Sequence, residues 1–136
     1  MSIDKDSKPW KVIVAGSRNL EVTKHQVMCA VCLLPSFDKF EQAINDYHIH
    51  LEFVSGACPT GPDQVAIEIA EECEITLKEF PADWTAHGKA AGPIRNRQMA
   101  EYASALVLLW NGSSRGSANM LKEAKAAGLE IVQVIL

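Results

Sequence analysis

Short apolar runs alternate with helix-like segments along this chain, and the alternation constrains the fold more than any other feature. Residues 105–110 (Ala-Leu-Val-Leu-Leu-Trp) are apolar throughout, which is typical of a central strand covered on both faces. Four other runs have the composition of strands, at residues 11–15, 51–54, 75–80 and 131–136. Five segments have helical spacing or helix-start signals, at residues 21–34, 37–47, 63–73, 93–102 and 114–127. The pattern predicts an α/β sandwich with a mostly parallel five-stranded sheet.

The bulk composition fits one globular domain. The chain has 136 residues, of which 48% are apolar and 22% are charged. We expect residues 1–10 to form a flexible tail and residues 11–136 to form the domain. No apolar run is long enough to span a bilayer, and the N-terminus lacks the apolar core of a signal peptide. We therefore expect a cytoplasmic protein that makes no membrane contact.

The charge distribution favours a small anionic partner. The net charge of −4 argues against a protein that coats long nucleic acid through a generally basic surface. Residues 80–115 nevertheless hold four Lys or Arg against two acids, whereas residues 68–79 hold five acids and one Lys. A local basic site on an acidic body suits a small anion better than a long polyanion.

Neither a metal nor a cofactor is expected. Cys29 and Cys32 form a C-x-x-C inside an apolar helical pattern without a second pair nearby, which favours buried thiols over zinc binding or a redox role. His48 and His50 lack a third ligand at suitable spacing, which favours surface positions.

The connection at residues 80–97 is the most unusual segment of the chain. Connectors in compact α/β domains are usually about two to six residues long, and longer ones are often functional. We interpret it as a structured loop that binds an anion through Lys89 and Arg95. Arg97 lies on a different helix face from Arg95, so we assign it to a structural carboxylate. We expect Trp84 to be a packing anchor for the loop rather than a stacking platform.

Three further loops combine glycine with hydroxyl or cationic groups, at residues 15–18, 55–63 and 111–117. Each alone is compatible with an ordinary turn. In an open parallel sheet, however, ligands bind at the carboxyl ends of the strands, so we expect all four segments to surround one pocket. Glycine lets the backbone approach a ligand, and helix N-termini favour anions. The candidate ligand-binding residues are Gly16, Ser17, Arg18, Gly56, Thr60, Gly61, Lys89, Gly92, Asn96, Gly112, Ser114, Arg115, Gly116 and Ser117.

These segments resemble motifs of the SLOG superfamily, in particular its YspA-like branch. The resemblance rests on A-G-S-R, S-G-A-C-P-T-G-P-D, F-P-A-D-W-x-x-H-G-K-A-A-G-P-I-R-N-R-x-M and S-R-G-S-A-N-M, and it covers about residues 12–136. It implies a Rossmann-like, doubly wound sheet with helices on both faces. It also implies that the glycine loops hold the phosphate or ribose of a nucleotide-like ligand.

The resemblance extends at a distance to the Lonely Guy phosphoribohydrolases, where Arg95 would correspond to their arginine. Met120 stands where those enzymes carry a glutamate, and this departure argues against N-glycoside hydrolysis by their route. A catalytic carboxylate would have to come from Asp63 or Asp83, with His87 as proton carrier. Asp63 is equally compatible with a helix N-terminal or capping role.

Three functions follow in order of preference. The first is a binding domain for a nucleotide or nucleotide-derived anion, acting as a sensor or sequestering domain. The second is a hydrolase that acts on an N-glycosidic or phosphate linkage of a nucleotide. The third is single-stranded DNA binding, because residues 95–97 look like a segment of DNA-processing protein A, although the acidic net charge speaks against it. A homodimer through the apolar residues 27–34 is a further expectation.

Overall fold

The structure is a computed structural model, and it describes residues 10–37 and 51–136. The helix expected over residues 37–47, apart from its first residue, lies outside the described residues, as do His48 and His50.

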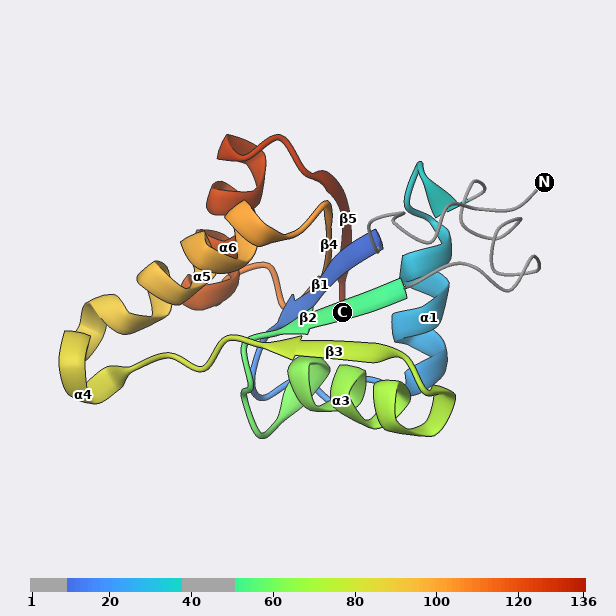
Figure 1. Ribbon diagram of the computed structural model, residues 1–136, viewed down its shortest axis with the longest axis horizontal. Coiled ribbons are helices and arrows are strands. Elements are labelled where there is room, and N and C mark those ends of the chain that lie inside the picture. The colour runs from blue at the N-terminus through green and yellow to red at the C-terminus, as the bar shows by residue number, and fades with distance from the viewer. Residues whose placement is uncertain (1–9, 38–50) are drawn as a thin grey trace.

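The described residues form one five-stranded sheet (Figure 1). Its strands are β1 (Trp10–Gly16), β2 (Leu51–Ser55), β3 (Thr76–Glu79), β4 (Ala105–Trp110) and β5 (Glu130–Ile135). The spatial order is β3-β2-β1-β4-β5, and every neighbouring pair is parallel. The predicted doubly wound α/β fold is confirmed, with a sheet that is parallel throughout. Strand order reverses between β1 and β4, which is where such sheets form a crevice at their carboxyl edge.

Helices cover the two faces of the sheet in pairs. The helices α1 (Lys24–Cys32) and α3 (Gly61–Cys73) pack on one face, and α5 (Ala91–Tyr102) and α6 (Arg115–Ala126) pack on the other. Successive residues of β4 alternate between the two cores, which explains why this strand is apolar at every position.

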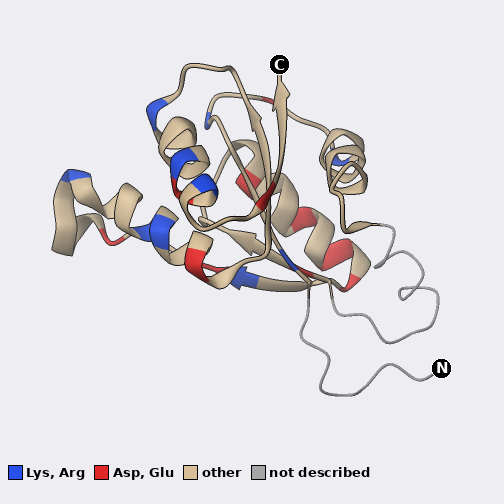
Figure 2. Cartoon of the chain, turned by 90° about the horizontal axis from the view of Figure 1, so that it is seen from above, with Lys and Arg blue, Asp and Glu red and all other residues tan. Residues whose placement is uncertain are grey.

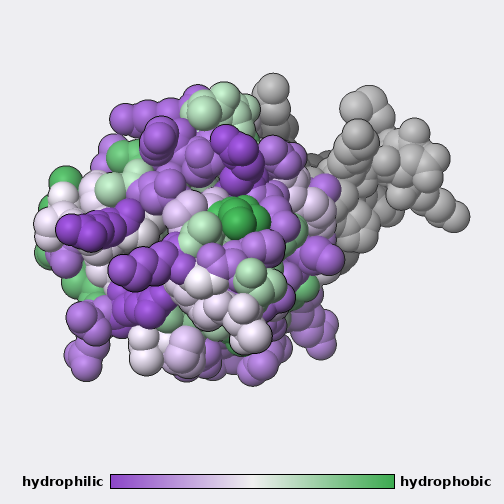
Figure 3. All heavy atoms as spheres, turned by 90° about the vertical axis from the view of Figure 1, so that its left-hand side faces the viewer, coloured by the Kyte–Doolittle hydropathy of each residue, from purple (hydrophilic) through white to green (hydrophobic). Residues whose placement is uncertain are grey.

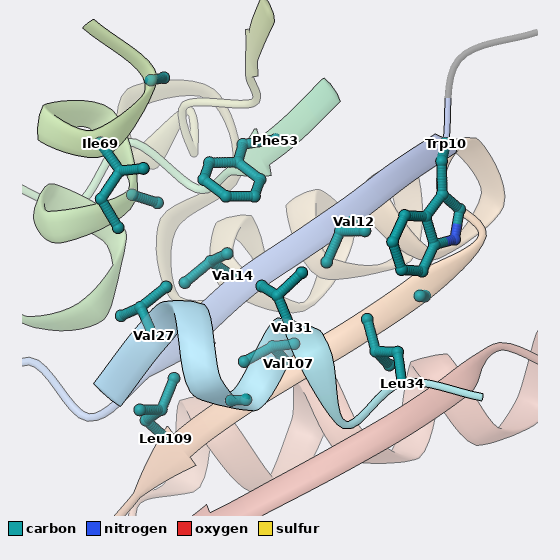
Figure 4. Close-up of a cluster of buried hydrophobic side chains, with 14 residues drawn as sticks. Trp10, Val12, Val14, Val27, Val31, Leu34, Phe53, Ile69, Val107 and Leu109 are labelled. Carbon is teal, nitrogen blue, oxygen red and sulfur yellow. The ribbon is translucent and has the colours of Figure 1, made fainter. Parts of the chain in front are cut away.

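The core beneath α1 corrects two expectations about that helix. Val27 and Val31 of this helix, and Leu34 just after it, point at the sheet and are buried there (Figure 4), so these three side chains form no free surface for a homodimer. Leu33 of the same run is exposed. The opposite face carries Cys29 and Cys32, which are both exposed rather than buried.

The N-terminal boundary of the sheet also differs from expectation. Trp10, which was expected to belong to a tail, is the first residue of β1, and its side chain is buried in the same core. The strand therefore begins one residue earlier than the boundary predicted for the domain.

The segment at residues 80–97 is mostly helical, so the prediction of a loop is wrong. It contains α4 (Trp84–His87) and the 3-10 helix η1 (Gly88–Ala90), and α5 follows directly. The Asp83 carboxylate accepts a hydrogen bond from the Ala86 N–H at 3.0 Å, which caps α4. Gly88 then takes a φ of 57°, a positive value that glycine adopts readily, and the chain turns toward α5.

Close packing at Gly16 fixes the carboxyl end of β1. A Cβ added there would lie 1.8 Å from the Leu109 carbonyl oxygen and 2.7 Å from Cγ of Pro62. At Gly61, whose φ is 73°, a Cβ would lie 2.7 Å from the Ser17 carbonyl oxygen. The end of β1, the end of β4 and the start of α3 therefore meet at distances that only glycine permits.

We expect Gly16→Ala to lower the free energy of unfolding by about 3 kcal/mol, the upper part of the usual range for overpacking, because one obstructing atom is backbone. Urea denaturation followed by circular dichroism measures the change. Gly116→Ala is the matched control: its Cβ would meet nothing within 4 Å, and alanine favours a helix, so no loss is expected. Equal stability of the two variants would contradict the packing argument.

Candidate functional site

A cavity of about 560 Å³ lies at the carboxyl edge of the sheet, where the strand order reverses. Its volume falls within the range of about 300–1,000 Å³ that is usual for small-molecule sites. Residues after β1 and β4, residues from the start of α3, and the first turns of α5 and α6 line it. Met99 and Met120, which are both buried, supply apolar wall surface.

A second hollow of about 400 Å³ adjoins this cavity. The two spaces share five lining residues, namely Arg18, Asn19, Cys58, Trp84 and Arg95. We call them the larger lobe and the smaller lobe of one site.

Ser17 joins the loop after β1 to the loop after β4. Its N–H donates to the Leu109 carbonyl oxygen at 3.3 Å, and its Oγ accepts a hydrogen bond from the Asn111 N–H at 3.2 Å. The side chain is buried at the wall of the larger lobe. Ser17 therefore sets the spacing of two loops that both reach the cavity.

The N-terminus of α6 opens into the larger lobe. The Asn111 Oδ1 accepts hydrogen bonds from the Ser113 and Ser114 N–H groups, each at 2.9 Å, and Ser114 Oγ accepts from the Ser117 N–H at 3.3 Å. These bonds hold the loop and cap the helix, while the N–H groups of the first two helical positions have no intrahelical acceptor. The second of these positions is glycine, so the backbone is open to a ligand.

The loop after β2 wraps over Asp63. The Asp63 side chain is buried, with 7% of the residue exposed, and its Oδ2 accepts a hydrogen bond from the Cys58 N–H at 3.3 Å. Ala57 takes a φ of 62°, which is unusual for a residue with a side chain. The Ala57 N–H donates to Ser55 Oγ at 3.1 Å, which helps to hold this bend.

Arg95, on α5, connects the loop after β2 to the helix pair α5 and α6. Its Nη1 donates to the Gly56 carbonyl oxygen at 2.6 Å, and its Nε donates to Asn96 Oδ1 at 2.9 Å. Asn96 in turn donates to the Gly116 carbonyl oxygen at 3.3 Å and to Asn119 Oδ1 at 2.9 Å. A guanidinium has five N–H donors, so Arg95 retains donors for a ligand, whereas the Asn96 amide is used within the fold.

The larger lobe is strongly cationic. Of the described residues that line it, four are cations, namely Arg18, Lys89, Arg95 and Arg115, and the one acid is Asp63. Figure 2 shows the contrast with α3, where acidic residues gather, whereas Lys and Arg occur along α5 and α6. Charges that converge on a half-enclosed space attract an anion more strongly than the same charges spread over a surface.

Burial dominates the ionisation of Asp63. It raises the pKa of this carboxyl from 3.8 to about 6, against the lowering influence of the Cys58 N–H and of the Arg95 and Arg18 charges. Burial also lowers the pKa of Arg95, and the nearby Asp63 charge opposes that shift. The two groups therefore stabilise each other's charged forms in a poorly solvated place.

The structure brings most of the predicted site residues together. The larger lobe is lined by Gly16, Ser17, Arg18, Asp63, Lys89, Gly92, Arg95, Asn96, Ser114, Arg115, Gly116 and Ser117. The smaller lobe is lined by Gly56 and Thr60, together with Arg18 and Arg95. Arg97 contacts Glu123 at 3.4 Å, away from the cavity, as the assignment to a structural carboxylate predicts.

Four predicted site residues line neither lobe. Gly61 serves the packing against Ser17, and Gly112 takes a φ of 85° in the turn before α6. Asp83 caps α4, and His87 is exposed at the end of the same helix. The proposed partnership of Asp83 and His87 with Arg95 in catalysis has no geometric basis in the described residues.

Several residues that line the cavity were not predicted as site residues from the sequence. Asn119 lies three positions after Gly116 on α6, so helical spacing could have placed it at the cavity. Cys58 lies between the glycines of the loop after β2, and no sequence pattern marks it as a cavity residue. Trp84, which we expected to be a packing anchor, is 50% exposed and lines both lobes.

Comparisons of the chain with known protein families, with curated proteins and with solved structures find no match. In residues 10–37 and 51–136, no helix combines the length and apolar character needed to cross a bilayer. Within the same ranges, no three His, Cys, Asp or Glu side chains gather in a way that could hold a metal ion.

The raised pKa of Asp63 predicts a loss of stability as the pH rises from about 4 to above 6. Over this range the folded chain releases a proton that the unfolded chain has already lost. The complete effect is about 3 kcal/mol, at about 1.4 kcal/mol for each pKa step. Relative to Asp63→Asn, the wild type should weaken by that amount between about pH 4 and pH 7.

Urea denaturation at each pH measures this difference. Asp83→Asn makes the same change at an exposed carboxyl outside both lobes and serves as the matched control for the substitution itself. A difference between wild type and Asp63→Asn that stays constant with pH would contradict the assignment of the buried charge.

Proposed function

We propose that this chain binds a nucleotide or a nucleotide-derived small anion, as a sensor or sequestering domain. One observation carries the proposal: four cations and the open N-terminus of α6 converge on one cavity of ligand size. Phosphate is the group that best matches this set, because backbone N–H groups at a helix N-terminus and guanidinium forks both complement its oxygens. The motifs shared with the SLOG superfamily point to the same class of ligand.

In this proposal the phosphate lies at the first turn of α6, with Arg115 beside it. Arg95 reaches the same lobe from α5 and is held there by Gly56 and Asn96. Asp63 is the one carboxylate among the described residues that line the larger lobe, so it is suited to accept a hydrogen bond from a sugar hydroxyl.

The side chains at two positions that could serve catalysis favour binding of the ligand without its hydrolysis. The position at which a phosphoribohydrolase would carry a glutamate is Met120, whose side chain belongs to the buried apolar cluster beneath α6. A thioether neither transfers a proton nor stabilises a developing cation. The imidazole of His87 lies outside the cavity.

Hydrolysis of a nucleotide is a second candidate, favoured by one observation. Asp63 lines the cavity beside Arg95, and its pKa of about 6 is close to the value that suits general acid–base catalysis near neutrality. Release of base or ribose phosphate from a nucleotide panel, abolished by Asp63→Asn, would favour this candidate over binding alone.

The geometry gives less support to single-stranded DNA binding. Arg95 turns into the cavity, Asn96 is buried against α6, and Arg97 contacts Glu123. The three side chains therefore offer no common surface along which a strand could lie.

Arg95→Gln is expected to weaken nucleotide binding by about 10- to 150-fold, because hydrogen bonds to charged groups are worth about 1.5–3 kcal/mol. Isothermal titration calorimetry with nucleoside monophosphates measures the loss. Arg97→Gln is the matched control two residues away, and it should bind as the wild type does because Arg97 contacts Glu123 instead. Equal effects of the two substitutions, or no binding by the wild type, would count against the proposal.

A further inference from the structure

The smaller lobe differs in character from the larger one. Its walls include Pro59, Pro81, Ala82 and Trp84, and no acid is among its described lining residues. Its volume of about 400 Å³ is itself within the range of small-ligand sites. Arg18 and Arg95 line both lobes; the larger lobe adds Lys89, Arg115 and the N-terminus of α6, whereas the smaller lobe adds the two prolines and Ala82.

Trp84 stands between the lobes with half of its surface exposed. One edge of its indole packs near Gly92, where an added Cβ would lie 3.3 Å from the ring. The other two tryptophans, Trp10 and Trp110, are 4% and 7% exposed. A tryptophan that served only to anchor its segment would be buried as those two are, so the open indole surface is available to a ligand.

Arg18 reinforces this surface from the loop after β1. Its guanidinium carbon lies 5.8 Å from the centre of the Trp84 ring, within the range of a cation–π contact. Guanidinium planes and indole rings both stack on nucleobases. Because Arg18 lines both lobes, it also lies where a phosphate and a ring of the same ligand would be closest.

Two polar side chains at the smaller lobe could recognise the edge of a ring, although the Thr60 hydroxyl also lies 3.9 Å from the Cys58 thiol. Thr60 is the N-cap residue of α3, yet its hydroxyl makes no capping hydrogen bond within the described structure. Asn19 is exposed, and no hydrogen bond to its side-chain amide occurs among the described residues. An aromatic ring with apolar neighbours and a few placed polar groups is the usual lining of a small-molecule pocket.

We propose that the smaller lobe binds the aromatic base of the ligand, stacked on Trp84, while the larger lobe holds its phosphate. This inference rests on the proposed function and narrows it: the ligand is a nucleotide with its base attached, not a sugar phosphate or a free inorganic anion. The sugar then lies at the wall shared by the lobes, near Arg95 and Asp63.

Calorimetry with two kinds of probe tests the inference. The wild type is expected to bind at least one of the four ribonucleoside 5′-monophosphates more tightly than ribose 5-phosphate. Trp84→Ala should weaken that nucleotide by about 5- to 150-fold, the range found for aromatic–base stacking, and weaken ribose 5-phosphate far less. Trp84→Phe, which keeps a flat ring, should recover most of the loss. Arg115→Gln should weaken both probes alike.

Fluorescence gives an independent reading that needs no variant. Since Trp84 is the exposed tryptophan of the three, the nucleotide should change the wild-type emission and ribose 5-phosphate should not. Equal affinity for nucleotide and ribose 5-phosphate, or an equal loss of both in Trp84→Ala, would overturn the base-binding role while the phosphate site stands. Failure of the wild type to bind either probe would overturn the proposed function itself.

Discussion

The close approach of three chain segments at the carboxyl end of β1 is the constraint on which the rest of the site depends. Gly16 brings β1 against the Leu109 carbonyl and Pro62, and Gly61 brings the start of α3 against Ser17. With this spacing, Ser17 bonds to both Leu109 and Asn111, and α3 carries its buried carboxylate to the cavity. A wider junction would separate the loops after β1, β2 and β4, and the cavity would lose its common wall.

The arrangement of charge follows from that junction. Placing Asp63 in a poorly solvated position costs stability, as its raised pKa indicates, and such groups are often retained because a site uses them. One carboxylate faces four cations, so the lobe carries an excess of positive charge that an anion would neutralise. The surface around α4 and α5 is mostly hydrophilic, with apolar residues in small patches (Figure 3), which suits a site that admits a polar ligand from solvent.

Local sequence patterns predicted the framework well and the details of residues 80–97 poorly. The run 105–110 could be placed because a strand buried on both faces must be apolar throughout, and the glycine loops could be grouped because parallel strands share one carboxyl edge. An aspartate just before a short helix could have been predicted to cap it, but the nearby His87 led us to predict a catalytic role for Asp83 instead. Whether Trp84 is buried or open depends on distant parts of the chain. No local pattern contains that information.

The most direct test of the account is an amide chemical-shift titration with a nucleoside monophosphate. The account predicts that the N–H signals of Arg115 and Gly116, of Cys58 and of the Trp84 indole move together with one dissociation constant, since all lie at one two-lobed site. Signals at the opposite edge of the sheet, such as those of Lys11 and Ser104, should stay in place. Shifts confined to that opposite edge, or dissociation constants that differ between the α6 and Trp84 signals, would contradict a single nucleotide site.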